Sequence, residues 1–156
     1  MNILFVCDGN VSRSFLAQML LKKELGHSNK GKFSVSSAGV SAFPGSPPDD
    51  QMVSYLTRMG VSTEGHRSRQ IEKEDVDWAD LIMVMEKHHI TKLQNLWPEA
   101  KGKVELLSKY IPGGQFADDI PDPFGRSPYH YRLSQSQITL AIRSLAKKLS
   151  SNRPEG

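Results

Sequence analysis

The residues best suited to chemistry lie near the N-terminus, where the single cysteine of the chain, Cys7, stands six positions before Arg13. A glycine-containing loop followed by a helix turns backbone N–H groups and the positive end of the helix dipole toward one point, which suits a doubly charged anion. The planar fork of an arginine can hold two phosphoryl oxygens. We therefore predict a phosphate-binding loop that consists of Asp8, Gly9, Asn10, Val11, Ser12, Arg13 and Ser14.

Cys7 is the candidate nucleophile of this loop. A thiol beside a helix N-terminus and an arginine is expected to exist largely as the thiolate, and Ser14 could donate a hydrogen bond that makes it a better leaving group. Gly9 allows the backbone to approach a ligand, and Asn10 tolerates a left-handed conformation. The implied reaction is attack on phosphorus through a cysteinyl-phosphate. On composition alone, a lone cysteine that closes an apolar strand is more often an inert core residue.

The elements around the loop indicate the fold class. Apolar runs predict strands at 2–6, 32–37, 80–85 and 103–107, and helical patterns end at Gly26, Gly60 and Leu96, with a last helix from about 129 to 149. Strands that alternate with helices favour a parallel sheet covered on both faces. We expect an α/β fold, a three-layer αβα sandwich with a four-stranded parallel sheet of the doubly wound, flavodoxin-like kind. Active sites of such sheets lie beyond the carboxyl ends of the strands, where Cys7 falls.

Length and composition limit the possible classes of protein. The 156 residues predict one domain over 1–150 and a frayed tail over 151–156. With 38% hydrophobic and 24% charged residues, no long apolar span and no signal peptide, we expect a cytoplasmic protein that binds no membrane. One cysteine excludes an internal disulfide. A net charge of +3 gives no reason to expect nucleic-acid binding, and the oligomeric state stays open.

The motif Cys-x-Gly-Asn-x-x-Arg-Ser resembles the low-molecular-weight protein tyrosine phosphatase family. Four further segments match the family in order: 36–39, 66–70, 79–85 and 122–125. The resemblance implies a phosphorylated protein or peptide as substrate, no cofactor, an aromatic wall at Phe43, and support of the loop by Ser37 and His66. The chain departs from the family at Ser12, usually a cysteine, and at Phe15, usually a proline.

Two acidic residues, Asp122 and Asp8, bear on the chemistry of the loop in opposite ways. Asp122 lies between two prolines in a long loop over 111–125, and a carboxylic acid there could protonate the departing oxygen. An Asp-Pro pair can also be a simple turn, but the match to the acid-bearing Asp-Pro of the family favours Asp122, with Asp118 and Asp119 as alternatives. Asp8 is unusual in the family. Unless its carboxylate points to solvent, it should oppose both thiolate formation and phosphate binding.

Several functions compete. A phosphotyrosine ring would gain from apolar contact with Val11 and from aromatic walls at Phe43 and Phe124. A bacterial branch that the chain also resembles removes phosphate from arginine, and typically has threonine in place of Val11. A phosphate-binding pseudo-enzyme is the third possibility, whereas an arsenate reductase would need further cysteines. We expect no metal site, because His88 and His89 lack a second ligand cluster and adjacent helical positions point apart.

Overall fold

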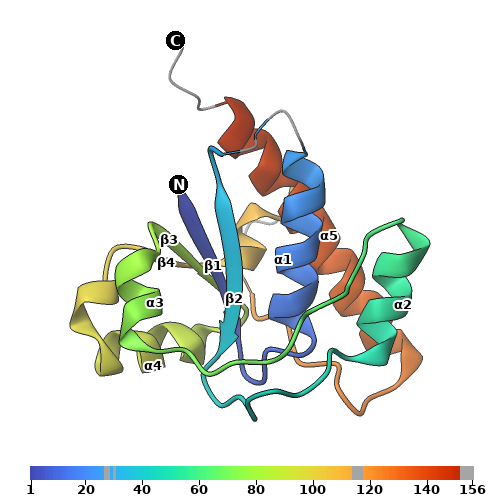
Figure 1. Cartoon of the computed structure of the whole chain (residues 1–156), viewed down its shortest axis with the longest axis horizontal. Coiled ribbons are helices and arrows are strands. Elements are labelled where there is room, and N and C mark those ends of the chain that lie inside the picture. The colour runs from blue at the N-terminus through green and yellow to red at the C-terminus, as the bar shows by residue number, and fades with distance from the viewer. Residues whose placement is uncertain (27–28, 30, 114–117, 152–156) are drawn as a thin grey trace.

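A four-stranded parallel sheet forms the centre of the computed structural model, which describes residues 1–26, 29, 31–113 and 118–151. The spatial order of the strands is β2-β1-β3-β4 (Figure 1). Their bounds are Asn2–Cys7 for β1, Ser34–Gly39 for β2, Leu81–Val84 for β3 and Val104–Leu106 for β4. This arrangement confirms the predicted fold class.

Helices cover both faces of the sheet, as Figure 1 shows. The bounds of the helices are Arg13–Leu25 for α1, Asp50–Arg58 for α2, Lys73–Trp78 for α3, Lys87–Leu96 for α4 and Pro128–Ser151 for α5. Successive side chains of a strand point to opposite faces. Ile3 and Phe5 of β1 accordingly pack against α1, α2 and α5, whereas Leu4 and Val6 pack against α3 and α4. The three layers therefore follow from the apolar run of β1.

The structure differs from the predicted elements in two places. No helix was expected between Gly60 and Asp80, yet α3 lies there, six residues long and opened by a capping box between Glu72 and Asp75. Six residues are too few for a helical apolar pattern to stand out. Ser151, predicted as the first residue of the tail, instead ends α5. Residues 152–156 of the tail and 114–117 of the predicted long loop lie outside the described residues.

The sheet and α1 together position the loop. Cys7 is the last residue of β1 and pairs with Gly39 at the end of β2. A Cβ on Gly39 would stand 2.5 Å from the carbonyl oxygen of Asp8, so only glycine lets the loop lie this close to β2. None of the helices in the described part of the chain has the length and apolar character needed to cross a bilayer.

Candidate active site

The loop after β1 forms a cup of backbone N–H groups. Asn10 adopts a left-handed conformation, with φ of 60°, as its type had suggested. Four carbonyl groups of the segment accept hydrogen bonds from outside it, namely those of Cys7, Asp8, Asn10 and Val11. These carbonyl groups therefore point away from the concave side of the loop. Because the peptide bonds are trans, each N–H points opposite to the C=O of its peptide, so the N–H groups of the residues that follow face the concave side. The cup therefore presents donors to an anion.

Asn10 is held by contacts from three directions. Its amide nitrogen donates to the hydroxyls of Ser14 and Ser37, each at 2.9 Å, and its amide oxygen accepts from the backbone N–H of Arg69 at 3.0 Å. Nε2 of His66 lies 2.9 Å from the carbonyl oxygen of Asn10 and, since a carbonyl only accepts, must donate to it. Ser37 and His66, the two residues expected to support the loop, therefore both contact Asn10 directly.

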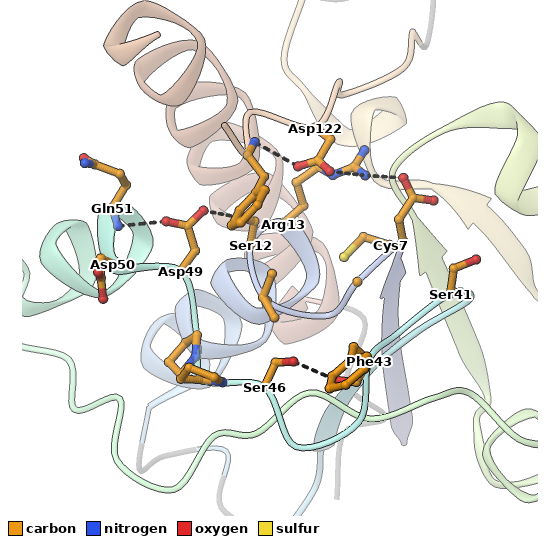
Figure 2. Close-up of a pocket in the computed structure, with 16 residues that line it drawn as sticks. Cys7, Ser12, Arg13, Ser41, Phe43, Ser46, Asp49, Asp50, Gln51 and Asp122 are labelled. Atoms are coloured by element: carbon orange, nitrogen blue, oxygen red, sulfur yellow. Dashed lines mark hydrogen bonds and ion pairs between the residues drawn. The ribbon is translucent and has the colours of Figure 1, made fainter. Parts of the chain in front are cut away.

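The Cys7 thiol lies inside this cup, buried, with the hydroxyl of Ser14 3.0 Å from its sulfur. Figure 2 shows the Cys7 side chain with Asp122 above it and Phe43 below it, on the wall of one cavity. Buried location alone fits an inert core cysteine, but a serine hydroxyl aimed at the sulfur and an arginine beside it do not. The surroundings of Cys7 are therefore polar, unlike those of an inert core cysteine.

Arg13 is buried at 1% exposure, and three of the five N–H donors of its guanidinium make hydrogen bonds to described residues. Nη1 donates to Glu86 at 2.9 Å and to the carbonyl oxygen of Ile120 at 2.7 Å, and Nη2 donates to Asp8 at 3.1 Å. Nε has no hydrogen-bond partner among the residues that the structure describes. Burial by itself would lower the pKa of Arg13, but Cys7, Glu86 and Asp122 outweigh it and raise that pKa. A fixed, charged arginine with an open Nε is suited to receive an anion oxygen.

Asp8 does not point freely to solvent, and it is not left unpaired. One carboxylate oxygen accepts from Nη2 of Arg13, and the other accepts from Nε2 of His89 at 2.9 Å. Burial works to raise the pKa of Asp8, but the hydrogen bond from His89 and the charge of Arg13 lower it overall. Asp8 is therefore a paired carboxylate beside the cup, an arrangement that the sequence had not suggested.

The cup opens into a cavity of about 720 Å³, whose lining includes Val11, Phe43, Phe124 and Asp122. Phe43 and Phe124 are 83% and 62% exposed, so both present apolar surface to whatever enters. One oxygen of Asp122 lies 4.0 Å from Nη2 of Arg13, and the other accepts from the N–H of Phe124 at 3.1 Å. All the predicted cleft residues thus border the same space.

The two alternative acids lie elsewhere. Asp119 accepts from the backbone N–H of Lys87 at 2.7 Å, and Asp118 lies 3.7 Å from the ammonium group of Lys87. Neither lines the cavity. Among the three carboxylates of this segment, Asp122 is the one that faces Cys7 and Arg13.

Ser12 takes part in a contact that sequence reasoning missed. Although it precedes α1 as its N-cap residue, its hydroxyl accepts no hydrogen bond from the N–H groups of that helix and instead donates to Asp49 at 2.5 Å. The same carboxylate oxygen accepts from the hydroxyl of Tyr131 at 2.7 Å, and the other oxygen caps α2 at the N–H of Gln51. Asp49 therefore ties the loop to α2 and α5.

A second missed group consists of Asp8, Glu86, His88 and His89, which each place one possible metal-ligand atom within 4.8 Å of the others. The expectation that the two histidines point apart is wrong, because their ring centroids are 4.2 Å apart and both Nε2 atoms face Glu86. Nδ1 of His89, however, accepts the backbone N–H of Glu86 at 3.1 Å, so Nε2 carries the proton. The carboxylate of Glu86 also accepts a hydrogen bond from Arg13. These bonds favour a hydrogen-bonded network over a metal centre.

The fold and the site define an α/β protein in which a loop at the carboxyl end of a parallel strand runs from a buried cysteine to a buried arginine. The family model described as low molecular weight phosphotyrosine protein phosphatase matches residues 2–155, and the chain belongs to this family.

Individual relatives carry different names. A protein-arginine-phosphatase of Geobacillus stearothermophilus is 35% identical over 97% of each chain. The low molecular weight protein-tyrosine-phosphatase Etp of Escherichia coli K12 is 33% identical over 96% of this chain and 95% of its own. Among solved structures, a mutant of the YwlE arginine phosphatase with a phosphorylated active site serine is 30% identical, with a TM-score of 0.86 over 98% of both chains.

Proposed function

We propose that this protein is a cysteine-dependent phosphomonoesterase that hydrolyses phosphotyrosine in proteins or peptides through a cysteinyl-phosphate. The observation that carries the proposal is that three residues line one cavity: Cys7, Asp122, and Arg13, whose buried Nε has no hydrogen-bond partner among the described residues. A binding module for phosphate would not need the acid. An acid facing the anion site is what a leaving group requires.

The chemistry assigns one role to each group. The loop N–H groups and Arg13 hold the phosphoryl oxygens while the Cys7 thiolate attacks phosphorus, and the bond from phosphorus to the phenolic oxygen breaks. Asp122 gives its proton to that oxygen. It then takes a proton from the water that attacks phosphorus, and the P–S bond breaks as the thiolate leaves, stabilised by Ser14. The phosphorylated serine in the YwlE mutant supports a covalent phosphoryl intermediate at the nucleophile position.

Phosphotyrosine is favoured as substrate by the apolar lining of the cavity. Val11 at its floor and the exposed rings of Phe43 and Phe124 suit an aromatic stem. Phosphoarginine is the second candidate, because relatives named arginine phosphatases match the chain over almost its full length. Val11 offers no hydroxyl to the polar N–H groups of a phosphoguanidinium, and burying such groups without partners costs roughly 1–3 kcal/mol.

Hydrolysis of three phosphorylated peptides tests the proposal. We expect the wild type to prefer phosphotyrosine over phosphoarginine in kcat/KM, with phosphoserine poorest because its short stem cannot bring the phosphate to the floor of the cup. Val11→Thr should shift the ratio toward phosphoarginine. A wild type that prefers phosphoarginine would refute the substrate and keep the mechanism.

Two variants test the mechanism itself. Cys7→Ser should lose nearly all hydrolysis while still binding phosphate, since the cup is built of backbone, and Arg13→Ala should lose both. Far-UV circular dichroism should stay native in each variant. Wild-type turnover by folded Cys7→Ser would exclude the covalent route, and phosphopeptide binding by a wild type without turnover would establish a pseudo-enzyme.

A further inference from the structure

We propose that His89 is a positioning residue, whose Nε2–H holds the carboxylate of Asp8 against Arg13 and thereby lets a negative charge next to the nucleophile coexist with phosphate binding. The proposal rests on the proposed function only in taking the loop as a phosphate site. His89 belongs to α4, and its side chain is fully buried, although the reaction makes no direct use of it.

Both ring nitrogens of His89 are committed. Nδ1 accepts the N–H of Glu86 at the start of α4, which leaves the proton on Nε2 and aims it at Oδ1 of Asp8. Burial lowers the pKa of His89 in spite of the carboxylate, so the ring is a neutral donor rather than a second cation. The tautomer is therefore fixed by the backbone of α4.

Asp8 needs such a donor because of its place in the chain. It follows Cys7 directly, and its side chain, 40% exposed, has room to turn. With Oδ2 on Arg13 and Oδ1 on His89, the two ends of the carboxylate are fixed on one side of the guanidinium, and Nε of Arg13 stays open to a ligand. Without the bond from His89, one oxygen is released and the carboxylate can approach the cup, where it would repel a phosphate dianion.

Glu86 completes the network and keeps it rigid. Its carboxylate accepts from Nη1 of Arg13, while its backbone N–H fixes the ring of His89. One residue thus orients both partners of Asp8. His88, the neighbour of His89 in the chain, is 58% exposed, and its Nε2 lies 3.2 Å from the carboxylate of Glu86. Among the described residues, the structure records no hydrogen bond from His88 to Asp8.

Two substitutions separate the bonds of His89. Asn places its amide oxygen about where Nδ1 lies, so His89→Asn keeps the acceptor for the N–H of Glu86 and loses the donor to Asp8. Gln reaches as far as Nε2, so His89→Gln keeps the donor to Asp8. We expect His89→Asn to raise the KM for an aryl phosphate and the dissociation constant for inorganic phosphate about tenfold, with a smaller change in kcat. His89→Gln should stay within about twofold of wild type.

A double-mutant cycle distinguishes positioning from a general structural effect. Asp8→Asn removes the charge that His89 restrains, so adding His89→Asn to it should change phosphate binding by less than about twofold. His88→Asn is the matched control, since it removes the neighbouring imidazole with its contacts to Glu86 and to the ring of His89, but no recorded hydrogen bond to Asp8. An equal loss in both backgrounds, or unchanged phosphate binding in folded His89→Asn, would overturn the proposal.

Two further readouts keep the test decisive. Calorimetric binding of inorganic phosphate needs no turnover, so it tests the positioning role even if no variant hydrolyses an aryl phosphate and the proposed function fails. If His89→Asn does not fold, the long-range ¹H–¹⁵N spectrum of the wild-type ring decides instead. We expect the Nε2–H tautomer at neutral pH, and a ring protonated on Nδ1 would refute the proposed bond to Asp8.

Discussion

The hydroxyl of Ser14 lies 3.0 Å from the sulfur of Cys7 and at the same time accepts a hydrogen bond from the side chain of Asn10 at 2.9 Å. Because the amide of Asn10 occupies a lone pair of this hydroxyl, the single hydroxyl proton is free to point at the sulfur. Asn10 is itself held by Ser37, Arg69 and His66. The loop therefore leaves the Ser14 hydroxyl proton free to donate to the sulfur of Cys7, as stabilisation of a departing sulfur would require.

Ser14→Ala should slow the second chemical step more than substrate binding. Without the hydroxyl the departing thiolate loses a hydrogen bond to a charged group, which corresponds to about tenfold in rate. We expect kcat to fall by up to about that factor with little change in kcat/KM, since that ratio does not contain the second step, and a burst of product before the slow steady state. Ser41→Ala, which alters a hydroxyl that lines the same cavity and contacts Lys92, is the control. A lower kcat without a burst would place the effect of Ser14 in the first step.

Asp122→Asn should slow phosphotyrosine cleavage far more than cleavage of an aryl phosphate whose leaving group needs no proton. The carboxylate faces Arg13 across 4.0 Å and lines the cavity, and proton transfer from a placed acid contributes about 100-fold or more in rate. The ratio of kcat values for the two substrates measures this role. Asp119→Asn removes a carboxylate that contacts Lys87 and should leave the ratio unchanged. Equal losses on both substrates after Asp122→Asn would argue against an acid at this position.

Tyr131→Phe should lower the free energy of unfolding by about 1–3 kcal/mol, because it removes a buried hydroxyl that donates to the carboxylate of Asp49. Burial and this hydrogen bond raise the pKa of Tyr131, which shows how firmly the hydroxyl keeps its proton. Urea denaturation followed by circular dichroism measures the change. Tyr129→Phe, at an exposed position of the same helix, is the matched control. A stability loss as small as that of the control would mean that Ser12 and Gln51 suffice to hold Asp49.

His66→Gln should flatten the dependence of stability on pH between about 7 and 5. Burial is the largest cause that lowers the pKa of His66 below its usual 6.5, so in this range the unfolded chain binds a proton that the folded chain does not. Stability is therefore fully present above about pH 6.5 and falls as the pH drops toward the folded-state pKa. Gln keeps a donor for the carbonyl of Asn10 but does not titrate. The free energy of unfolding at several pH values measures the slope, part of which should persist because burial also lowers the pKa of His89. A slope equal to that of wild type would show that His66 does not contribute.

The local part of the site could be predicted from the sequence because its members are neighbours along the chain. Cys7, Asn10, Arg13 and Ser14 fall within eight residues, and a strand, a tight turn and a helix that follow one another leave few ways to arrange them. The left-handed Asn10 and the glycine that ends α1 follow from backbone sterics at single residues. The alternation of strands and helices along the chain likewise predicted that both faces of the sheet are covered.

The partners of these residues were decided by the tertiary structure. Arg13 meets Glu86 across 73 positions, Asp8 meets His89 across 81, and Asp49 meets Tyr131 across 82. No periodicity in the sequence indicates such pairs, because they form only when the ends of β1 and β3 come together and α5 folds back over α1. Asp8 illustrates the consequence: from its position alone it should oppose the anion site, whereas the packing of α4 supplies the histidine that restrains it. Residue types and spacing therefore predicted the chemistry of the loop, and long-range packing determined how its charges are held.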